Sequence, residues 1–189
     1  MTLKTAMPTL LTADEFASLG DIGRAELVRG RIIHLTKPRP KHGRIAMRIG
    51  TAISNFVQKH NLGEVYAAET GFIAGRDPDS VRAPDVAFVR AEIVASHNEE
   101  DWLPHSPDLA VEVLSPSERS DQTADKVQMW LGGGARSVWV FDPKARTATV
   151  YQATGGVWTF KDGADLRDDS VLPGFVFRVN DAFGKITSD

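Results

Sequence analysis

The chain has 189 residues, of which 42% are hydrophobic and 25% are charged, and its formal net charge is −3. These values are typical of a globular protein and exclude a disordered or fibrous chain as the starting hypothesis. The sequence contains no cysteine, which excludes disulfides, thiolate zinc sites, iron–sulfur clusters and cysteine nucleophiles.

The length and the hydropathy pattern together predict one soluble domain over residues 1–189. No apolar run approaches the roughly 18 residues that a membrane-spanning helix needs, so we expect no membrane partner. The N-terminal residues lack the long apolar segment and the small-residue cleavage site of a secretory signal. We therefore expect a cytoplasmic protein.

The first forty residues predict a short helix and a β-hairpin. Thr12 and Glu15 have the spacing of a capping box, in which two side chains satisfy backbone N–H groups at the start of a helix. Residues 26–35 are typical of a hairpin that turns near Arg29 and Gly30. The Pro-Arg-Pro sequence at 38–40 predicts a connector, because proline disfavours helix interiors and sheet ladders.

A long amphipathic helix is predicted from His42 to Asn61, since apolar residues recur there three and four positions apart. Three strand-like runs follow, at residues 64–74, 83–89 and 109–114. The third run, LAVEVL, is apolar on both faces except at one glutamate, which is typical of a strand in the middle of a covered sheet.

The rest of the chain predicts a second helix at 117–131, ended by three glycines, and then a strand at 137–142. A meander follows at 147–152 and 156–161, and residues 171–183 predict a closing strand and final turn that cover one sheet edge. This order of elements predicts an α/β fold, with a mixed β-sheet flanked by helices and extra antiparallel strands.

Charge is unevenly distributed along the chain. Residues 24–48 contain eight basic residues and one acid, a balance of +7, whereas residues 92–125 contain nine acids and one arginine, a balance of −8. A dense basic stretch can attract phosphate backbones even in a protein whose overall charge is negative. The simpler alternative is that both stretches are solvated faces.

Two acids occupy positions of particular interest. Glu112 lies in a strand of Leu, Ala and Val, and a buried carboxylate without a partner is costly, so it needs a cation or a raised pKa. Asp85 follows Pro84 at the start of the VAFV strand. If the two strands pair, both acids converge at one edge of the sheet, where a hard divalent cation relieves their repulsion.

Lys126 and Glu26 are further candidates. Lys126 comes fourteen residues after Glu112 and lies off the apolar stripe of its helix, so its side chain is directed at the sheet end or at water. Glu26 in the first hairpin is a possible additional acid. The structural alternative is that Glu112 and Lys126 form a buried ion pair and that Asp85 caps a strand end.

Other chemical signatures are absent from the sequence. The five histidines lack the spacing of zinc motifs, and there is no GxSxG, Walker A or GxGxxG sequence. We interpret Asp108 as the start of its strand. No motif of another catalytic or metal-binding class therefore competes with the carboxylate residues named above.

Several fragments of the chain resemble the Uma-two family of bacterial proteins, which is described as a restriction endonuclease family within the PD-(D/E)XK nuclease superfamily. The pairing of RAPDVAFV with PDLAVEVLSPS is the most specific part of the resemblance. The fragments cover nearly the whole chain in the order of the family: AELVRGRII, PRPKHGRIAMRIGTAI, VRAPDVAFV, PDLAVEVLSPS, ADKVQMW, VWVFDP and VLPGFVFRVNDAF.

The resemblance implies a restriction-endonuclease-like core with Mg²⁺ at the sheet edge. By this resemblance, Asp85 takes the aspartate position and Glu112 takes the (D/E) position, and both are metal ligands. The superfamily usually has a lysine two residues after that acid, whereas this chain has Leu114. Lys126 matches a lysine that the family has moved to the following helix. Glu26 matches the acid of the family's first hairpin.

The predicted function is hydrolysis of DNA phosphodiester bonds that depends on Mg²⁺ or, alternatively, Mn²⁺. The catalytic candidates are Asp85, Glu112, Lys126 and Glu26. We expect the basic stretch to contact nucleic acid, and we expect a homodimer, because double-strand cleavage with one active site per chain favours two copies. The expected contact residues are Arg31, Lys41, His42, Arg44 and Arg48. By the resemblance, His42 also matches a family histidine at the start of the long helix.

Two alternatives to this function remain open. The first is a nuclease-fold protein that binds nucleic acid or another partner without cleaving it, which the missing lysine at position 114 allows. The second is a hydrolase that uses a carboxylate pair on sugars, which predicts one raised carboxylate pKa and no dependence on metal. The second alternative does not explain Lys126 or the basic stretch.

Overall fold

A six-stranded mixed sheet forms the centre of the computed structural model, which describes residues 10–98, 100–116 and 118–184. The strand order is β10-β9-β8-β7-β6-β3; only β7 and β8 pair in parallel, and the other neighbours are antiparallel. The strands are β3 (Gly63–Ala67), β6 (Val86–Arg90), β7 (Leu109–Val113), β8 (Ser137–Asp142), β9 (Thr147–Gln152) and β10 (Val157–Lys161).

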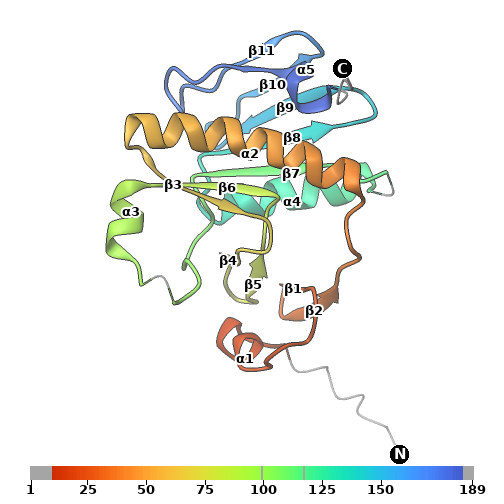
Figure 1. Ribbon diagram of the computed structural model, residues 1–189. Helices are drawn as coiled ribbons and strands as arrows, with labels where there is room; N and C mark the ends of the chain where they lie inside the picture. The colour runs from red at the N-terminus through yellow and green to blue at the C-terminus, as the bar shows by residue number, and fades with distance from the viewer. Residues whose placement is uncertain (1–9, 99, 117, 185–189) are drawn as a thin grey trace, which may run out of the picture.

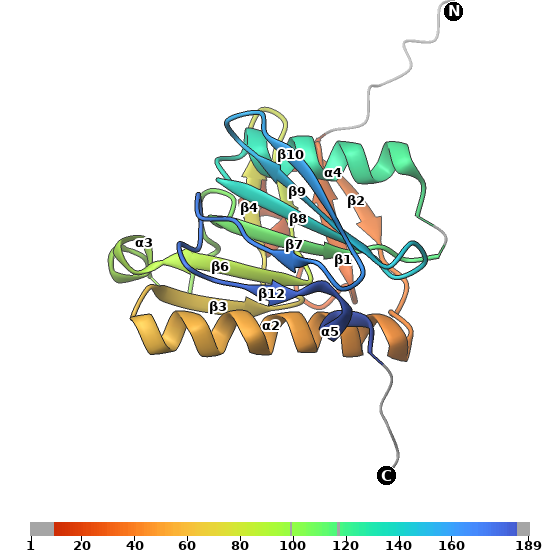
Figure 2. The ribbon, with the colours of Figure 1, turned by 90° about the horizontal axis from the view of Figure 1, so that it is seen from above.

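Helices α2 (Pro40–His60) and α4 (Ser120–Gly132) cover opposite faces of this sheet (Figure 2). The alternation of side chains along β7 explains this arrangement, because successive residues of a strand point to opposite faces. Val111 packs with the apolar stripe of α2, and Ala110 packs with Val127 and Trp130 of α4. The predicted mixed sheet with helices on both faces is confirmed.

A second sheet carries the N-terminal hairpin and has the order β2-β1-β5-β4 (Figure 1). Its strands are β1 (Ala25–Val28), β2 (Arg31–His34), β4 (Phe72–Gly75) and β5 (Ser80–Arg82), and helix α1 (Ala13–Ala17) packs beside it. The capping box of Thr12 and Glu15 and the hairpin turn at Arg29 and Gly30 are both present, as predicted.

The predicted single strand at 64–74 is wrong. A turn divides it into β3 of the central sheet and β4 of the second sheet, and Glu69 in that turn has a φ of 77°. A positive φ interrupts extended backbone, so the two halves pair with different partners. The predicted strand at 83–89 begins later, at Val86, and β5 was not anticipated.

The ends of the two long helices differ slightly from the predicted ones. Helix α2 begins at Pro40, inside the predicted connector, because proline is well accommodated in the first turn of a helix, where its missing N–H has no partner to lose. Helix α4 begins at Ser120; Ser117, where the sequence pattern placed its start, lies outside the described residues. The short helix α3 (Ala91–Ser96) was not predicted.

The C-terminal segment folds over the α2 side of the central sheet. It contains β11 (Asp165–Leu166), β12 (Phe177–Arg178) and α5 (Val179–Phe183), and β11 pairs with β12. Leu172 and Phe177 are buried in the same core as Ile49 of α2. The prediction that residues 171–183 cover an edge is therefore wrong, because their apolar side chains pack against a face.

Asp168 anchors this segment to the sheet. Its side chain is buried and accepts hydrogen bonds from Ser137 Oγ at 2.5 Å, Trp139 Nε1 at 2.9 Å and Gln152 Nε2 at 2.6 Å, and also from the hydroxyl of Ser170. All of these donors are neutral, so among the described residues the carboxylate is stabilised by hydrogen bonds and not by an ion pair. No helix among the described residues is long and apolar enough to span a bilayer.

Candidate active site

Asp85 and Glu112 lie opposite each other on two adjacent strands. In the antiparallel register of β6 and β7, Val86 pairs with Val111 and Ala87 with Ala110, so extension of the register by one residue places Asp85 opposite Glu112. The backbone N–H of Asp85 donates to Val111 O at 3.0 Å, which continues the ladder to this point. Directly opposed residues have neighbouring side chains, so the predicted convergence of the two acids is confirmed.

Two contacts to the Oδ2 atom hold the Asp85 carboxylate in position. Oδ2 accepts the backbone N–H of Val113 at 2.7 Å and lies 3.2 Å from Nε2 of His42 at the start of α2. Both of these contacts go to Oδ2. The hydrogen bond to Asp85 raises the pKa of His42 above its usual value, although burial opposes this shift.

Glu112 is buried on the α4 side of the sheet, with 6% of its surface exposed. Its Oε1 accepts the indole N–H of Trp130 at 2.8 Å, and its Oε2 lies 3.1 Å from Nζ of Lys126. Burial raises the pKa of Glu112, and the charge of Asp85 raises it further, whereas Lys126 opposes both. A cation between the two acids would favour the charged form of Glu112.

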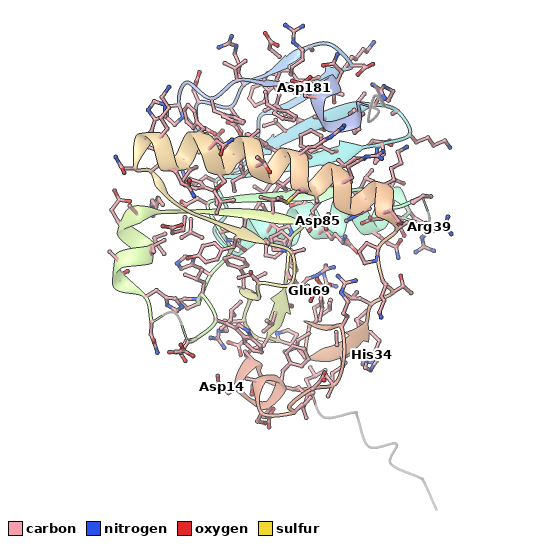
Figure 3. All side chains as sticks on the ribbon, viewed as in Figure 1. Asp14, His34, Arg39, Glu69, Asp85 and Asp181 are labelled. Carbon is pink, nitrogen blue, oxygen red and sulfur yellow. The ribbon has the colours of Figure 1, made fainter. Side chains whose placement is uncertain are left out.

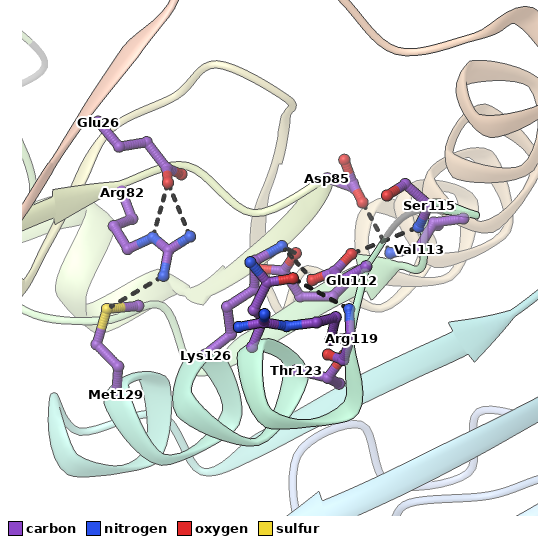
Figure 4. A network of polar contacts seen from close by, with 12 residues as sticks. Glu26, Arg82, Asp85, Glu112, Val113, Ser115, Arg119, Thr123, Lys126 and Met129 are labelled. Atoms are coloured by element: carbon purple, nitrogen blue, oxygen red, sulfur yellow. Dashed lines mark hydrogen bonds and ion pairs between the residues drawn. The ribbon is translucent and has the colours of Figure 1, made fainter. Parts of the chain in front are cut away.

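Lys126 lies between two acids (Figure 4). Its Nζ is 3.1 Å from Glu112 Oε2 and 2.9 Å from Glu118 Oε1. Burial disfavours the charged amine, but the charges of Glu112 and Glu118 outweigh burial and raise the pKa of Lys126. The lysine is therefore a fixed ammonium group. Lys126 and Trp130 are four residues apart on α4 and therefore lie on the same face of the helix, from which both side chains contact Glu112.

Glu118 and Trp130 were not identified as site residues from the sequence. The i, i+4 spacing of Lys126 and Trp130 could have indicated that both reach the same acid. Glu118 lies in the irregular loop before α4, and a loop of this kind has no periodic sequence pattern from which its path could be predicted. Its side chain is 11% exposed, and Oε2 accepts the backbone N–H of Ser115 at 3.4 Å.

Glu26 lies in the same polar network but is bound to an arginine (Figure 4). Its Oε2 is 2.8 Å from both Nε and Nη2 of Arg82, and its Oε1 accepts the backbone N–H of Ala83 at 3.3 Å. Nη1 of Arg82 also lies 3.9 Å from Sδ of Met129 on α4. Arg82 thus neutralises Glu26 and joins β1 to α4 beside the two opposed acids.

The residues of the predicted nucleic-acid contact are distributed over several surfaces. His42 lies in the site beside Asp85, and Arg31 and Arg44 are exposed. Lys41 Nζ donates to Pro143 O at 3.3 Å. Arg48 instead donates to backbone carbonyls at Asp181 and Gly184, so it joins α2 to α5.

The donor set at this position fits a hard cation with few protein ligands. No group of three or more His, Asp or Glu side chains suited to a metal occurs within 10–98, 100–116 and 118–184. Asp85 and Glu112 nevertheless present carboxylate oxygens from opposed positions. Mg²⁺ is commonly held by one or two carboxylates, with water and substrate phosphate completing its coordination. The two acids match that pattern.

Comparisons with known proteins identify the family and the fold of the chain. The family model "Uma2: Putative restriction endonuclease" matches residues 13–180. The fold is similar to the crystal structure of a "putative nuclease belonging to DUF820 from Anabaena variabilis ATCC 29413", with a TM-score of 0.78, 22% sequence identity, and coverage of 92% of this chain and 97% of that one. No curated protein matches the sequence.

Proposed function

The chain belongs to the Uma2 restriction endonuclease family, and from this premise we propose that it hydrolyses phosphodiester bonds of DNA with Mg²⁺ or Mn²⁺ held by Asp85 and Glu112. The observation that carries the proposal is the convergence of three groups where the neighbouring strands β6 and β7 meet: Asp85 lies opposite Glu112, and Lys126 is 3.1 Å from Glu112. A buried pair of acids beside a fixed ammonium group combines metal ligands with a charge that can act on a phosphate.

Each residue has a distinct part in this chemistry. When bound, a divalent cation supplies Lewis-acid polarisation of the phosphate and a lowered pKa of water. Lys126 stabilises the negative charge that develops on the phosphate oxygens. The hydrogen bonds from His42 and Val113 hold the Asp85 carboxylate in place, and Trp130 fixes the orientation of Glu112. Glu26 acts through Arg82, by supporting the wall of the site.

A nuclease fold that binds nucleic acid without cleaving it is the second candidate. It is favoured by the ion pairs of Lys126, which occupy Glu112 and Glu118 in the structure. A protein of this kind would retain DNA affinity after the loss of Asp85 or Lys126. Measurement of binding and cleavage on the same variants therefore separates the two candidates.

The test is a cleavage assay on supercoiled plasmid and on single-stranded DNA, with Mg²⁺, with Mn²⁺ and with EDTA. We expect cleavage that EDTA abolishes, and we expect Asp85→Asn and Lys126→Ala each to lower the rate by about a hundredfold or more. The matched controls are Asp162→Asn and Lys161→Ala, since both residues are exposed, Lys161 at the end of β10 and Asp162 in the turn that follows it.

The controls are expected to cleave as fast as the wild-type protein. Equal rates for the wild type, Asp85→Asn and Lys126→Ala would contradict the proposed site. Binding of DNA with no cleavage in Mg²⁺ and none in Mn²⁺ would favour the second candidate.

A further inference from the structure

A pocket of about 400 Å³ is continuous with the candidate active site. Asp85, Glu26 and Arg82 line one part of it. Its remaining wall comes from α1, from the second sheet and from the turn between β3 and β4. The wall residues that matter for its chemistry are Phe16, Arg24, Leu35, Glu69, Gly71 and Trp102. We call this space the side pocket; its volume lies within the range of pockets that bind small ligands.

Two aromatic side chains give the side pocket an apolar surface. The ring centroids of Phe16 and Trp102 are 5.7 Å apart. Gly71 permits this position of Trp102, since a Cβ atom at Gly71 would lie 2.9 Å from the indole Nε1. Leu35, which is 36% exposed, adds a further apolar group. A planar ring is the ligand for which aromatic and aliphatic walls are suited.

The charges of the side pocket disfavour a phosphate within it. Four acids, namely Asp21, Glu26, Glu69 and Asp85, face only the arginines Arg24 and Arg82. Arg24 forms an ion pair with Glu69, in which Nε lies 2.7 Å from Oε1, and its Nη1 donates a hydrogen bond to Thr36 O at 2.8 Å. Arg82 forms an ion pair with Glu26. The excess of carboxylate acceptors therefore disfavours an anionic group in the pocket and favours a group that carries N–H donors.

Glu69 lies where it can contact the edge of such a ligand. Figure 3 shows it between Asp85 and Asp14 in the view of Figure 1. Its side chain is 65% exposed, and its backbone has a φ of 77° in the turn that separates β3 from β4. A carboxylate at this position can accept a hydrogen bond from an exocyclic amine of a nucleobase.

We propose that the side pocket receives one unpaired nucleobase of the DNA strand whose phosphate lies at Asp85; this inference rests on the proposed function and specifies its substrate. Nucleobases are neutral and planar and carry N–H donors, as the exocyclic amines of adenine, cytosine and guanine do, which matches the walls and the charges of the pocket. A base in a duplex is paired and stacked, and its extrusion costs a few kcal/mol. The protein therefore prefers single-stranded DNA, or an unpaired nucleotide, to an intact duplex.

The test measures binding separately from cleavage. Fluorescence anisotropy of labelled oligonucleotides is recorded with Ca²⁺ in place of Mg²⁺, for a single strand, for the same strand with one abasic position moved along it, and for a duplex. We expect Trp102→Leu to weaken single-strand binding by about tenfold, the loss of one base–aromatic stack, and to leave duplex binding unchanged. The matched control is Trp158→Leu, because Trp158 is exposed on β10 and is not part of the pocket.

The abasic strand provides a second, independent measurement. At one position along the strand, we expect removal of the base to weaken binding by the wild-type protein about tenfold. At that same position, we expect removal of the base to cause no further loss of affinity in Trp102→Leu, since the substitution and the abasic site remove the same contact. Gly71→Ala, which displaces the indole, is expected to follow Trp102→Leu. If Trp102→Leu fails to give a cooperative thermal transition, Gly71→Ala is judged by the same criteria.

The inference is overturned if the Trp102 or Gly71 variant binds single strands as tightly as the wild type, if it loses single-strand and duplex affinity equally, or if the wild type does not bind single strands. Cleavage of DNA with none of these Trp102 effects would contradict the side pocket alone. Binding through Trp102 without cleavage in Mg²⁺ would contradict the proposed hydrolysis alone.

Discussion

Lys126 is a side chain whose position depends on two acids from different parts of the chain. Glu112 comes from a strand, Glu118 comes from the loop before α4, and the ammonium group contacts both. The superfamily arrangement that the sequence resembles would place the lysine on the strand itself. On a helix, the lysine side chain needs a second anchor to fix its direction, and Glu118 provides it.

We predict that Glu118→Gln lowers kcat for DNA cleavage by about ten- to a hundredfold and changes KM little, as expected for a residue that orients another group. Glutamine keeps the shape of the side chain but removes the charge that holds the ammonium group. Steady-state kinetics on single-stranded DNA provides the measurement. Asp121→Asn is the control, since Asp121 is 65% exposed and contacts Arg119. An unchanged kcat for Glu118→Gln would contradict the positioning of Lys126.

At the residue scale, the sequence predicted the central trio but only part of its surroundings. Glu112 was identifiable because a single acid interrupts an apolar strand, and Asp85 because it begins the neighbouring strand. Glu118 could not be identified, because its contact with Lys126 depends on the path of an irregular loop. The pairing of Glu26 with Arg82 likewise depends on β1 and β5 being neighbours in a sheet that was not predicted.

At the element scale, helix α1 is joined to the turn between β4 and β5 by one carboxylate. Asp79 Oδ2 accepts the backbone N–H of Ala13 at 2.8 Å and contacts Arg76 Nη1 at 2.8 Å. Burial acts to raise the pKa of Asp79, but the two donors outweigh it and lower the pKa below the usual 3.8. The charged carboxylate is therefore the form that stabilises this contact.

We predict that Asp79→Ala lowers the free energy of unfolding at neutral pH by about 1–3 kcal/mol, the cost of a buried donor without a partner. Because the folded-state pKa is depressed, the stabilisation is present above about pH 4 and is lost as the pH falls through the folded-state pKa. Urea unfolding at several pH values tests this. A difference between wild type and Asp79→Ala that grows on acidification would contradict it; Asp14→Ala, an exposed acid of the same helix, is the control.

The elements that periodicity describes were predictable, and those that depend on distant pairing were not. The hairpin, α2, α4 and β7 to β10 follow from local patterns of apolar residues and turns. The division of 64–74 depends on a left-handed residue at Glu69, and a glutamate does not signal that conformation in the way that glycine does. Strands of two or three residues, such as β5 and β11, carry too little pattern to be identified.

At the scale of the whole molecule, several residues of the two charged stretches are bound by partners that lie outside both stretches. Arg24 pairs with Glu69, and Arg48 joins α2 to α5 through backbone carbonyls. Glu112 and Glu118 share Lys126. The balances of +7 and −8 therefore overstate the separation of charge at the surface, because several members of each stretch are engaged within the protein.

We predict that Asp168→Asn destabilises the entire fold by about 1–3 kcal/mol. Every side-chain neighbour of the Asp168 carboxylate donates a hydrogen bond, and an amide replaces one acceptor by a donor, so at least one buried donor loses its partner. Thermal and urea unfolding measure the loss. Asp169→Asn is the control, since Asp169 is exposed and accepts only the N–H of Gly174 through Oδ1 among the described contacts. Equal stability of Asp168→Asn and wild type would show that the carboxylate is not required.

The parallel pairing of β7 with β8 has a consequence for the order in which the parts of the candidate site form during folding. Glu112, Glu118, Lys126 and Trp130 all belong to the contiguous unit of β7, α4 and β8, so this half of the site needs only contacts that are close in sequence. Asp85 joins through the neighbouring strand β6. Glu26 arrives through the pairing of Leu27 with Val81, a contact between distant residues that carries a larger loop-closure cost. For refolding of the complete chain, this difference in sequence separation predicts that the acid–lysine pair forms before the hairpin docks.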